Sequence, residues 1–210
     1  MRIEKFKMGD SDLNIPIAEN YKDCITLIKS DHFRLTGKNE SFIHILFQNI
    51  RPFRNSLLFW LRLSSYRGIL YPFCRLFYQI NSVKYSVQIS PFTKIGYGFY
   101  IGHGICIVVN TKTIIGNNVN ISQFVNIGTN HNSPAIIGDN VYIAPHVSIV
   151  ENVTIGHNSS IGAGAVVTKD IPENATAVGV PAKTLNFNQP GRYVNRRFDF
   201  TQQLKEVLKN

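Results

Sequence analysis

One glycine-flanked histidine in the sequence has a residue type and setting suited to proton transfer. His103 lies in the stretch Tyr100-Ile101-Gly102-His103-Gly104. An imidazole with a pKa of about 6.5 is largely neutral at pH 7, so it can accept a proton from a hydroxyl group. His103 is therefore the first candidate for a general base. The alternative is a surface histidine with no chemical role.

The elements that must position His103 are set by an aliphatic residue that returns every six positions. An α-helix repeats at about 3.6 residues and a strand at about 2, so this period favours short strands joined by tight corners. Such a period is typical of a parallel β-helix, in which each rung buries its aliphatic residue against the next. The thirteen repeat starts are Ile89, Ile95, Ile101, Ile107, Ile115, Ile121, Ile127, Ile137, Ile143, Ile149, Ile155, Ile161 and Val167.

Two interruptions break the period. Two extra residues fall near Thr113, and four extra residues fall between Ile127 and Ile137. An insertion in a solenoid leaves the coil as a loop, and such loops tend to gather on the functional face. The longer loop contains His131, which is the rival of His103 as a functional histidine.

His103 occupies the third position of its six-residue repeat, from which a side chain points outward. Since every third repeat shares a face, we expect His103 to lie above Gln123, Pro145 and Ala163. The small residues Ala144, Ala163 and Gly164 leave backbone groups bare along this face, where a ligand with amide groups can bind. Small residues also suit tight corners, which is the alternative explanation for them.

The composition is that of a medium-sized chain with basic flanks. Its 210 residues suffice for a core. The three cysteines are widely spaced and odd in number, which favours a reducing compartment over a disulfide framework. The polar segment from Met1 to Asn20 does not resemble a signal peptide, and no apolar run approaches the roughly 20 residues of a membrane span.

The net charge of +9 is unevenly distributed. Residues 89–185 carry four basic and four acidic residues, whereas residues 1–88 carry 13 basic against 7 acidic. Between Ser41 and Gln88 there is no acidic residue, and arginines alternate with aromatics. This pattern favours either a helical cap with an aromatic core or a peripheral membrane surface. Because no nucleic-acid motif accompanies the charge, we expect no nucleic-acid partner.

The sequence therefore divides into three parts. Residues 1–88 are predicted to form an N-terminal helical cap, irregular over residues 1–16 and broken at Gly37, Pro52, Gly68 and Pro72. Residues 89–185 form the repeat domain, and residues 186–210 form a basic C-terminal tail.

The chain resembles the serine acetyltransferase family of hexapeptide-repeat acyltransferases over nearly its whole length. The stretches that carry this resemblance are Tyr100 to Gly104, Ile143-Ala144-Pro145, Ile161 to Val167 and Gly179 to Lys183. The stretch from Ser30 to Gly37, before an arginine-rich aromatic segment, resembles the surface-polysaccharide O-acetyltransferase branch. The resemblance implies a mainly β fold: a left-handed parallel β-helix with an N-terminal α-helical cap and a short C-terminal tail.

The resemblance also implies roles for individual residues. His103 is the expected base and Gln88 its orienting partner, with no metal. His131, Asp31 and Arg34 are expected near the acceptor. Acetyl-CoA is the expected acyl donor, bound by Thr129, Ala144, Ala163, Gly164, Thr168, Lys169 and Lys183. A homotrimer is expected, with each CoA site between neighbouring chains.

Two departures from the family pattern concern the acceptor. Family members pair the base with an Asp in a Val-Asp-Ile-x-Pro stretch, and here Gln88 stands in place of that Asp. The Asp that precedes the base in the family is Gly102. Without both carboxylates a cationic amino acid is a poor acceptor, whereas a neutral sugar hydroxyl needs neither.

We therefore expect an acetyl-CoA-dependent O-acetyltransferase that acts directly on a sugar hydroxyl of a surface polysaccharide. One alternative is a serine O-acetyltransferase that acts on L-serine in cysteine biosynthesis. Another is a CoA-binding or scaffold solenoid that has lost catalysis. The expected location is the cytoplasm, with the inner face of the membrane as the site of contact for the basic aromatic cap.

Overall fold

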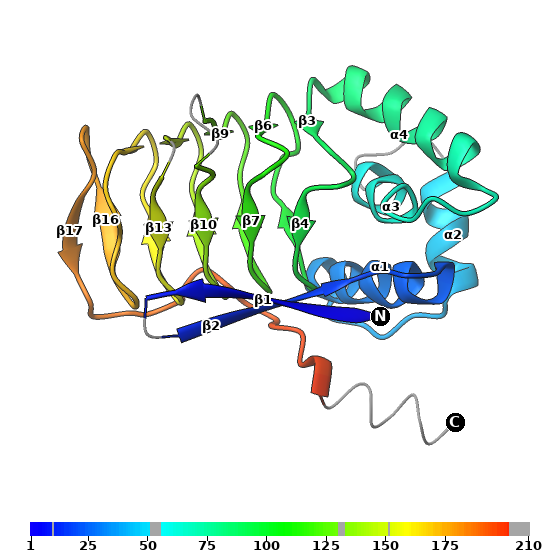
Figure 1. Ribbon diagram of the computed structural model, residues 1–210, viewed down its shortest axis with the longest axis horizontal. Coiled ribbons are helices and arrows are strands. Elements are labelled where there is room, and N and C mark those ends of the chain that lie inside the picture. Colours follow the sequence, from blue (N-terminus) through cyan, green and yellow to red (C-terminus); the bar gives the residue numbers. More distant parts are fainter. Residues whose placement is uncertain (10, 51–55, 130–132, 151, 202–210) are drawn as a thin grey trace.

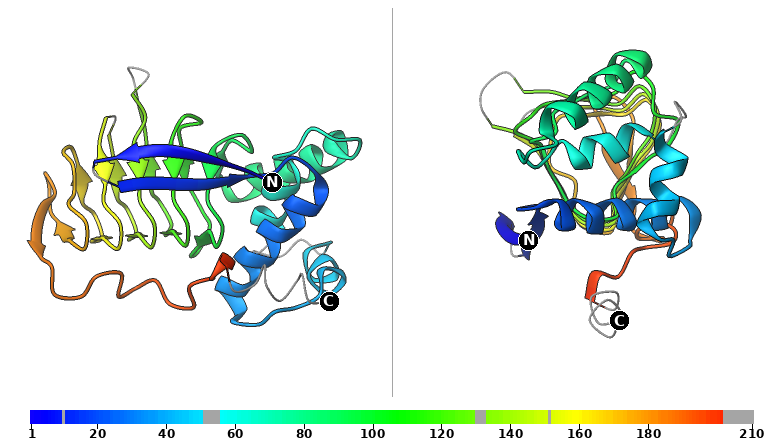
Figure 2. Two further views of the ribbon diagram at one scale, coloured as in Figure 1. Left: turned by 60° about the horizontal axis from the view of Figure 1, so that its bottom comes forward. Right: turned by 90° about the vertical axis from the view of Figure 1, so that its right-hand side faces the viewer.

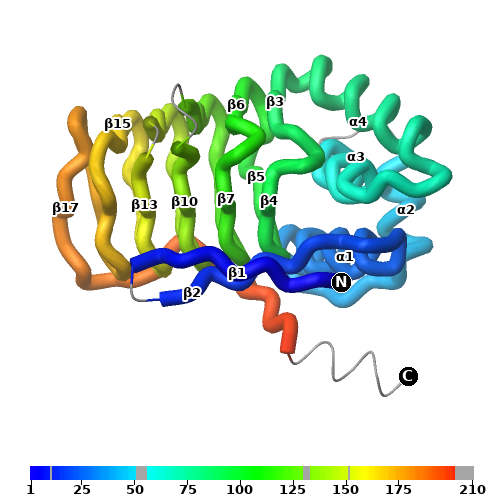
Figure 3. The backbone as a smooth tube through the Cα atoms, in the orientation of Figure 1, coloured from blue at the N-terminus to red at the C-terminus, as the bar shows by residue number. Residues whose placement is uncertain are grey.

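The computed structural model describes residues 1–9, 11–50, 56–129, 133–150 and 152–201. Stacked coils form a three-sided prism, and four helices close one end of it (Figures 1 and 3). A β-hairpin lies along one side of the prism, and the C-terminal segment runs back toward the helices (Figure 2). The predicted parallel β-helix with a helical cap is confirmed.

Each coil contributes one short strand to each of three parallel sheets. The first sheet contains β3 (Gln88–Ile89), β6 (Val108–Val109), β9 (Asn126–Ile127), β12 (Ser148–Ile149) and β15 (Val166–Val167). The second sheet contains β4 (Lys94–Ile95), β7 (Ile114–Ile115), β10 (Ile136–Ile137) and β13 (Thr154–Ile155). The third sheet contains β5 (Tyr100–Ile101), β8 (Asn120–Ile121), β11 (Tyr142–Ile143), β14 (Ser160–Ile161), β16 (Thr176–Val178) and the antiparallel β17 (Lys183–Asn186).

The second residue of each two-residue strand points into the prism, and the first points outward. Ile115, Ile127, Ile137 and Ile143 are fully buried in one continuous core. Burying one such side chain stabilises the fold by about 1.5–3 kcal/mol, and neighbouring strand residues face opposite sides. The repeat therefore fixes which residue of each rung lies inside.

The first interruption of the repeat does not lie where the sequence predicted it. Val109, not Ile107, pairs with Ile127 and with Ile89 in the first sheet. The two extra residues therefore fall between Ile101 and Val109, and the prediction that they lie near Thr113 is wrong. The sequence misled because Ile107 is also buried, so either aliphatic residue fits the period.

Residues 2–17 form a hairpin of β1 (Arg2–Met8) and β2 (Ser11–Ile17), and the prediction of an irregular segment is wrong. Leu13 and Ile15 are fully buried against Ile114, which points outward from the second sheet. The partner surface lies about a hundred residues away in the sequence, so no local pattern marks the hairpin. It covers the outer face of the second sheet.

Four helices form the cap: α1 (Tyr21–Thr36), α2 (Phe42–Ile50), α3 (Ser56–Leu63) and α4 (Tyr71–Tyr85). α1 ends at Gly37, which adopts a left-handed conformation with φ of 73°, as the predicted break requires. Pro72 does not break a helix but lies in the first turn of α4, where proline is tolerated because that N–H needs no partner. Pro52 lies outside the described residues.

A buried ion pair fixes the cap on the first coil. The Arg62 side chain of α3 donates to both carboxylate oxygens of Asp31 in α1, at 2.8 and 3.0 Å. Arg62 also donates to the carbonyl of Ile95 at 2.9 Å, and the Phe99 N–H donates to Asp31 at 2.8 Å. Burial raises the pKa of the Asp31 carboxyl, and the neighbouring guanidinium opposes this shift. The Asp31–Arg62 pair thus joins α1 and α3 to each other and to the first coil.

The C-terminal segment after β17 returns along the third sheet to α1 (Figure 2). The Asn120 side chain donates to the Tyr193 carbonyl at 3.0 Å, and Arg196 donates to the Leu35 carbonyl at 2.7 Å. The ring of Phe198 packs on Phe33 with centroids 5.8 Å apart. The predicted tail is therefore a strap that ties the far end of the prism to the cap.

Among the described residues, no helix is long and apolar enough to cross a membrane.

Candidate active site

His103 lies in an insertion at the corner between the third and first sheets. The Gly102 N–H donates to the Ile121 carbonyl, and the next coil repeats this contact from Ser122 to Ile143. Phe124 then donates to the Ile105 carbonyl, as His146 does to Gln123. Gly102 therefore corresponds to Ser122 and Ile105 to Gln123, which leaves His103 and Gly104 as the two extra residues.

This register corrects the expected position of His103. Ile105, not His103, stands above Gln123, because the insertion displaces the histidine from the regular stack. His103 has a φ of 51°, and its side chain is exposed. A solenoid expels extra residues from its coil, and here the expelled residue is the candidate base.

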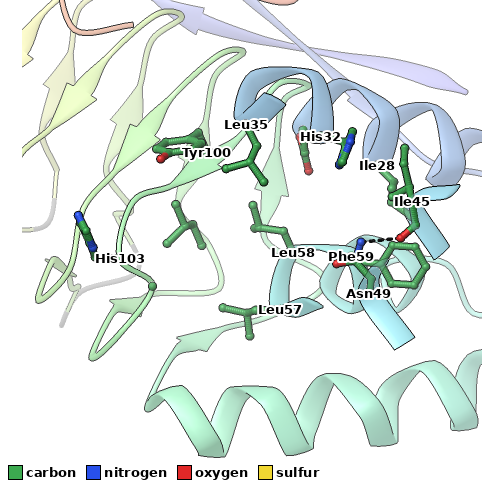
Figure 4. Close-up of a pocket in the computed structure, with 13 residues that line it drawn as sticks. Ile28, His32, Leu35, Ile45, Asn49, Leu57, Leu58, Phe59, Tyr100 and His103 are labelled. Atoms are coloured by element: carbon green, nitrogen blue, oxygen red, sulfur yellow. Dashed lines mark hydrogen bonds between the residues drawn. The ribbon is translucent and has the colours of Figure 1, made fainter. Parts of the chain in front are cut away.

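The displaced histidine lies beside a pocket between the first coil and the cap. The pocket has a volume of about 210 Å³. Figure 4 shows His103 at one end of it and the side chains of α1, α2 and α3 at the other. Most of the lining is apolar and comes from Ile28, Leu35, Ile45, Leu57, Leu58, Phe59 and Ile101.

Asp31 and His32, which line this pocket, already have partners. Asp31 is held by Arg62, and the His32 Nε2 lies 2.8 Å from the Glu40 carboxylate. Asn49 is buried and donates to the Ile45 carbonyl at 2.7 Å, while its Oδ1 has no hydrogen-bond partner among the described residues. The pocket thus offers a neutral ligand apolar walls and an unpaired amide oxygen.

Asp31 and Arg34 both attach α1 to the solenoid, while the Arg34 Nη1 is buried with no hydrogen-bond partner among the described residues, so their contact with an acceptor stays a prediction. Both oxygens of Asp31 are occupied, as described for the cap. Arg34 is also buried, donates to the Gly98 carbonyl at 3.1 Å and bonds to the Asn120 side chain. Burial lowers the pKa of Arg34 to about 10. The structure gives both residues the role of fixing α1 on the solenoid.

Gln88 is the residue expected to orient the imidazole of His103. Gln88 points outward from β3 in the first sheet, where it lies beside Val108. Although both side chains are within the described residues, no hydrogen bond joins them. The role of Gln88 in orienting the imidazole therefore stays a prediction.

The three small residues expected to bind CoA lie on the same corner as His103. Ala144 and Ala163 follow β11 and β14 of the third sheet. Gly164 has a φ of 70°, and a Cβ atom there would meet nothing within 4 Å, so its backbone is open. We call this corner, which contains residues 102–107, 122–125, 144–147 and 162–165, the His103 edge.

The other expected CoA contacts lie elsewhere on the prism. Thr129, Thr168 and Lys169 follow strands of the first sheet, at the corner between the first and second sheets. Lys183 begins β17 in the last coil. Within one chain these residues and the His103 edge lie on different parts of the prism.

His131 lies outside the described residues. Its loop leaves the prism between β9 of the first sheet and β10 of the second. The strands on either side of this loop belong to the first and second sheets, whereas His103 lies at the corner between the third and first sheets.

Several pocket residues were not anticipated from the sequence. Tyr100 begins the stretch that contains His103, but Asn49 and Leu58 come from separate helices of the cap. No spacing within one helix marks such a set, because the pocket arises only when the helices meet the first coil. Among the described residues, no group of three His, Cys, Asp or Glu side chains is arranged to hold a metal ion.

Comparisons with known proteins give consistent results. The family model for "Bacterial transferase hexapeptide (six repeats)" matches residues 134–169. A serine acetyltransferase of Staphylococcus xylosus is 34% identical over 155 residues, which cover 69% of this chain and 71% of that protein. A serine acetyltransferase of Bacillus pumilus is also 34% identical, over 62% of this chain and 61% of the relative's length. The chain thus spans about three fifths of that relative.

A solved structure described as a serine acetyltransferase in complex with CoA is also similar. Its TM-score is 0.55 at 27% identity, and the match covers 78% of this chain and 68% of the other. The similarity therefore extends beyond the repeats that the family model matches.

Deletion of His103 and Gly104 should leave the fold intact, because the following coils close the same corner without these two residues. We expect the free energy of unfolding to change by no more than about 1 kcal/mol. Deletion of Pro145 and His146 is the matched control, since it removes regular residues and breaks the register of the core. Urea unfolding followed by circular dichroism measures both. Equal destabilisation by the two deletions would contradict the assignment of the insertion.

Proposed function

Because the chain belongs to the serine acetyltransferase family, we propose that it transfers an acetyl group from acetyl-CoA to an acceptor hydroxyl. The observation that carries this proposal is the insertion of His103, which sets an imidazole between a pocket and an edge of small residues. The pocket has room for an acceptor. The bare backbone of the His103 edge suits the pantetheine arm of CoA.

In the proposed reaction His103 accepts the hydroxyl proton as the acceptor oxygen attacks the thioester carbonyl. Backbone N–H groups of the His103 edge stabilise the negative charge that develops on the carbonyl oxygen. The tetrahedral intermediate then collapses, the carbon–sulfur bond breaks, and the CoA thiolate takes the proton from the imidazolium. The acetyl group thus passes directly to the acceptor, and the hydroxyl proton passes through His103 to the CoA thiolate.

L-serine is the acceptor favoured by the names of the relatives. The comparisons do not support the prediction of a surface-polysaccharide sugar. One observation nevertheless keeps a neutral sugar hydroxyl as the second candidate. The ammonium group of serine needs an unpaired carboxylate, whereas both oxygens of Asp31 beside the pocket already accept hydrogen bonds from Arg62. If L-serine is the acceptor, the loop that contains His131 would contact its charged groups.

We propose in addition that three chains assemble around the first sheet. The hairpin covers the second sheet and the strap crosses the third. The outward residues Gln88, Val108 and Asn126 of the first sheet are exposed. A neighbouring chain on this face would bring its loop of residues 128–135 toward a His103 edge. In a trimer with closed cyclic symmetry, every chain would bury this face against a neighbour.

Replacement of His103 by alanine should lower kcat by about 10²–10⁴-fold, because the reaction loses its base. Binding of CoA, measured by isothermal titration, should stay close to wild type. His44→Ala is the control, since His44 is an exposed histidine on α2 that does not line the pocket beside His103. Release of free thiol from acetyl-CoA gives the rate. A folded His103→Ala protein with near wild-type turnover would exclude His103 as the base. Failure of the wild-type protein to bind CoA would favour a scaffold solenoid without catalytic activity.

L-serine should support thiol release, and His131→Ala should raise the KM for L-serine while the KM for acetyl-CoA stays nearly constant. The reason is that the loop is expected to contact the acceptor and not the donor. Nucleotide sugars and oligosaccharides are tested in the same assay. Higher kcat/KM with a sugar, together with no effect of His131→Ala, would replace serine by the second candidate.

Light scattering should give a mass of three chains of 23.7 kDa each. Val108→Glu on the first sheet should shift the protein to smaller species, because it places a charge in the proposed contact. Val83→Glu, on the cap, should not. A stable monomer of the wild-type chain would contradict the trimer.

A further inference from the structure

Several aromatic rings of the cap are buried, whereas a pair of stacked rings is exposed on the prism. Phe59, Trp60 and Tyr78 of the cap are buried, so the prediction that they settle at a membrane surface is wrong for these three. Phe124 and His146 lie on the His103 edge, with ring centroids 4.5 Å apart and ring planes 14° apart. Phe124 is 42% exposed and His146 is also exposed. This pair is therefore a surface feature and not part of the core.

The two rings occupy equivalent positions in successive coils, as the backbone hydrogen bonds between the coils show. The Gly164 N–H donates to the Pro145 carbonyl at 2.9 Å in the same pattern, so Gly164 is the equivalent residue of the next coil. Cys106 is the equivalent residue of the coil before Phe124. We call these four residues, Cys106, Phe124, His146 and Gly164, the ring column.

Every residue of the ring column has a positive φ, of 52°, 60°, 60° and 70° in chain order. This conformation brings Cβ close to the following carbonyl oxygen, which costs free energy for residues other than glycine and least for asparagine. Away from the His103 edge, the other non-glycine residues between 88 and 178 that the structure describes with a positive φ are all asparagines, namely Asn118, Asn140, Asn152, Asn158 and Asn174. The costlier residue types are thus confined to the His103 edge. Backbone strain of this kind tends to persist at functional sites.

The asparagines at another corner show what a purely structural residue does in this position. The Asn140 side chain donates to that of Asn158 at 3.1 Å, and Asn158 donates to Asn174 at 3.2 Å. These hydrogen bonds join one coil to the next. Phe124 cannot form such a bond, and much of its ring lies outside the core. Joining the coils therefore does not explain why a phenylalanine occupies this corner.

The ring column has an open place beside His146. Gly164 has no side chain, and a Cβ atom there would meet nothing within 4 Å. Neighbouring strands lie about 4.7–4.9 Å apart, which is close to the 4.5 Å between the two ring centroids. One further planar ring therefore has room above Gly164, on the face of His146 that Phe124 leaves uncovered.

The proposed reaction has one substrate with a planar aromatic ring system, which is the adenine of CoA. L-serine and sugars have none. The His103 edge is the place where the donor is proposed to bind, and stacking recognises the flat face of a base. Gly164 lies three coils beyond His103, at about 14 Å, which the pantetheine arm and the diphosphate together can span.

We propose that the Phe124–His146 stack binds the adenine ring of CoA, which lies on His146 in the open place above Gly164. This inference rests on the proposed use of CoA as the acyl donor. The rival occupant is a neighbouring chain, because the corner borders the first sheet. Only the adenine proposal requires the place above Gly164 to stay open for CoA and not for assembly.

Isothermal titration of the full chain with CoA tests the proposal. Phe124→Asn/His146→Asn should weaken CoA binding by about tenfold or more, because stacking on the base is lost. The free energy of unfolding should not fall, since asparagine tolerates a positive φ better than phenylalanine. The same variant should raise the KM for acetyl-CoA. Its kcat/KM with acetyl-pantetheine, a donor that lacks the adenine nucleotide, should stay close to wild type.

Gly164→Asn should also weaken CoA binding, because it fills the open place with a residue that suits the backbone. Gly9→Asn is the matched control, since Gly9 in the hairpin turn has a φ of 61° and likewise nothing within 4 Å of an added Cβ. The control should bind CoA as the wild type does.

Wild-type CoA affinity in both the double variant and Gly164→Asn would overturn the adenine site and leave acetyl transfer untouched. A wild-type chain that does not bind CoA would overturn both proposals. A lower light-scattering mass of the double variant would assign the rings to a contact between chains and would also overturn the adenine site. So would an equal loss of CoA binding in Gly9→Asn, or an equal loss of activity with acetyl-pantetheine in the double variant.

Discussion

The inward aliphatic residue of each rung is the constraint on which the rest of this structure depends. Ile115, Ile127 and Ile137 are buried in columns that continue from coil to coil, so any residue beyond the period of six must leave at a corner. The chain has such extra residues at two places, and each place contains a histidine. The first is His103 with Gly104, and the second is the loop of residues 128–135 that contains His131.

An exposed histidine on a corner does not by itself bind an acceptor. In this chain the cap forms a pocket beside His103. The Asp31–Arg62 pair and the contacts of Arg34 hold α1 and α3 on the first coil, so that the helices face His103 across a pocket. Breaking a buried ion pair by removing one partner commonly costs about 3–5 kcal/mol, so loss of either Asp31 or Arg62 should destabilise this attachment. Asp31 and Arg34, which the sequence suggested for acceptor binding, also attach the cap to the first coil. The strap adds a second attachment through Arg196 and Phe198.

The period of the repeat was enough to predict the solenoid, its sheets and the loop after Ile127. It was not enough to locate the first insertion, because Ile107 and Val109 are both aliphatic and both buried. Strand pairing alone distinguishes them. The hairpin was missed because its partner, Ile114, lies far away in the sequence, and the pocket because its walls come from three helices and one coil. Local spacing predicts what one element does, whereas these features depend on how elements meet.

A crystal structure of the protein with CoA and its best acceptor tests the central claim most directly. The account predicts that the reacting hydroxyl oxygen lies within about 2.6–3.2 Å of a His103 ring nitrogen. It also predicts that the pantetheine arm follows the His103 edge past Ala144 and Gly164. A hydroxyl placed against His131 instead, with His103 facing only solvent, would contradict it.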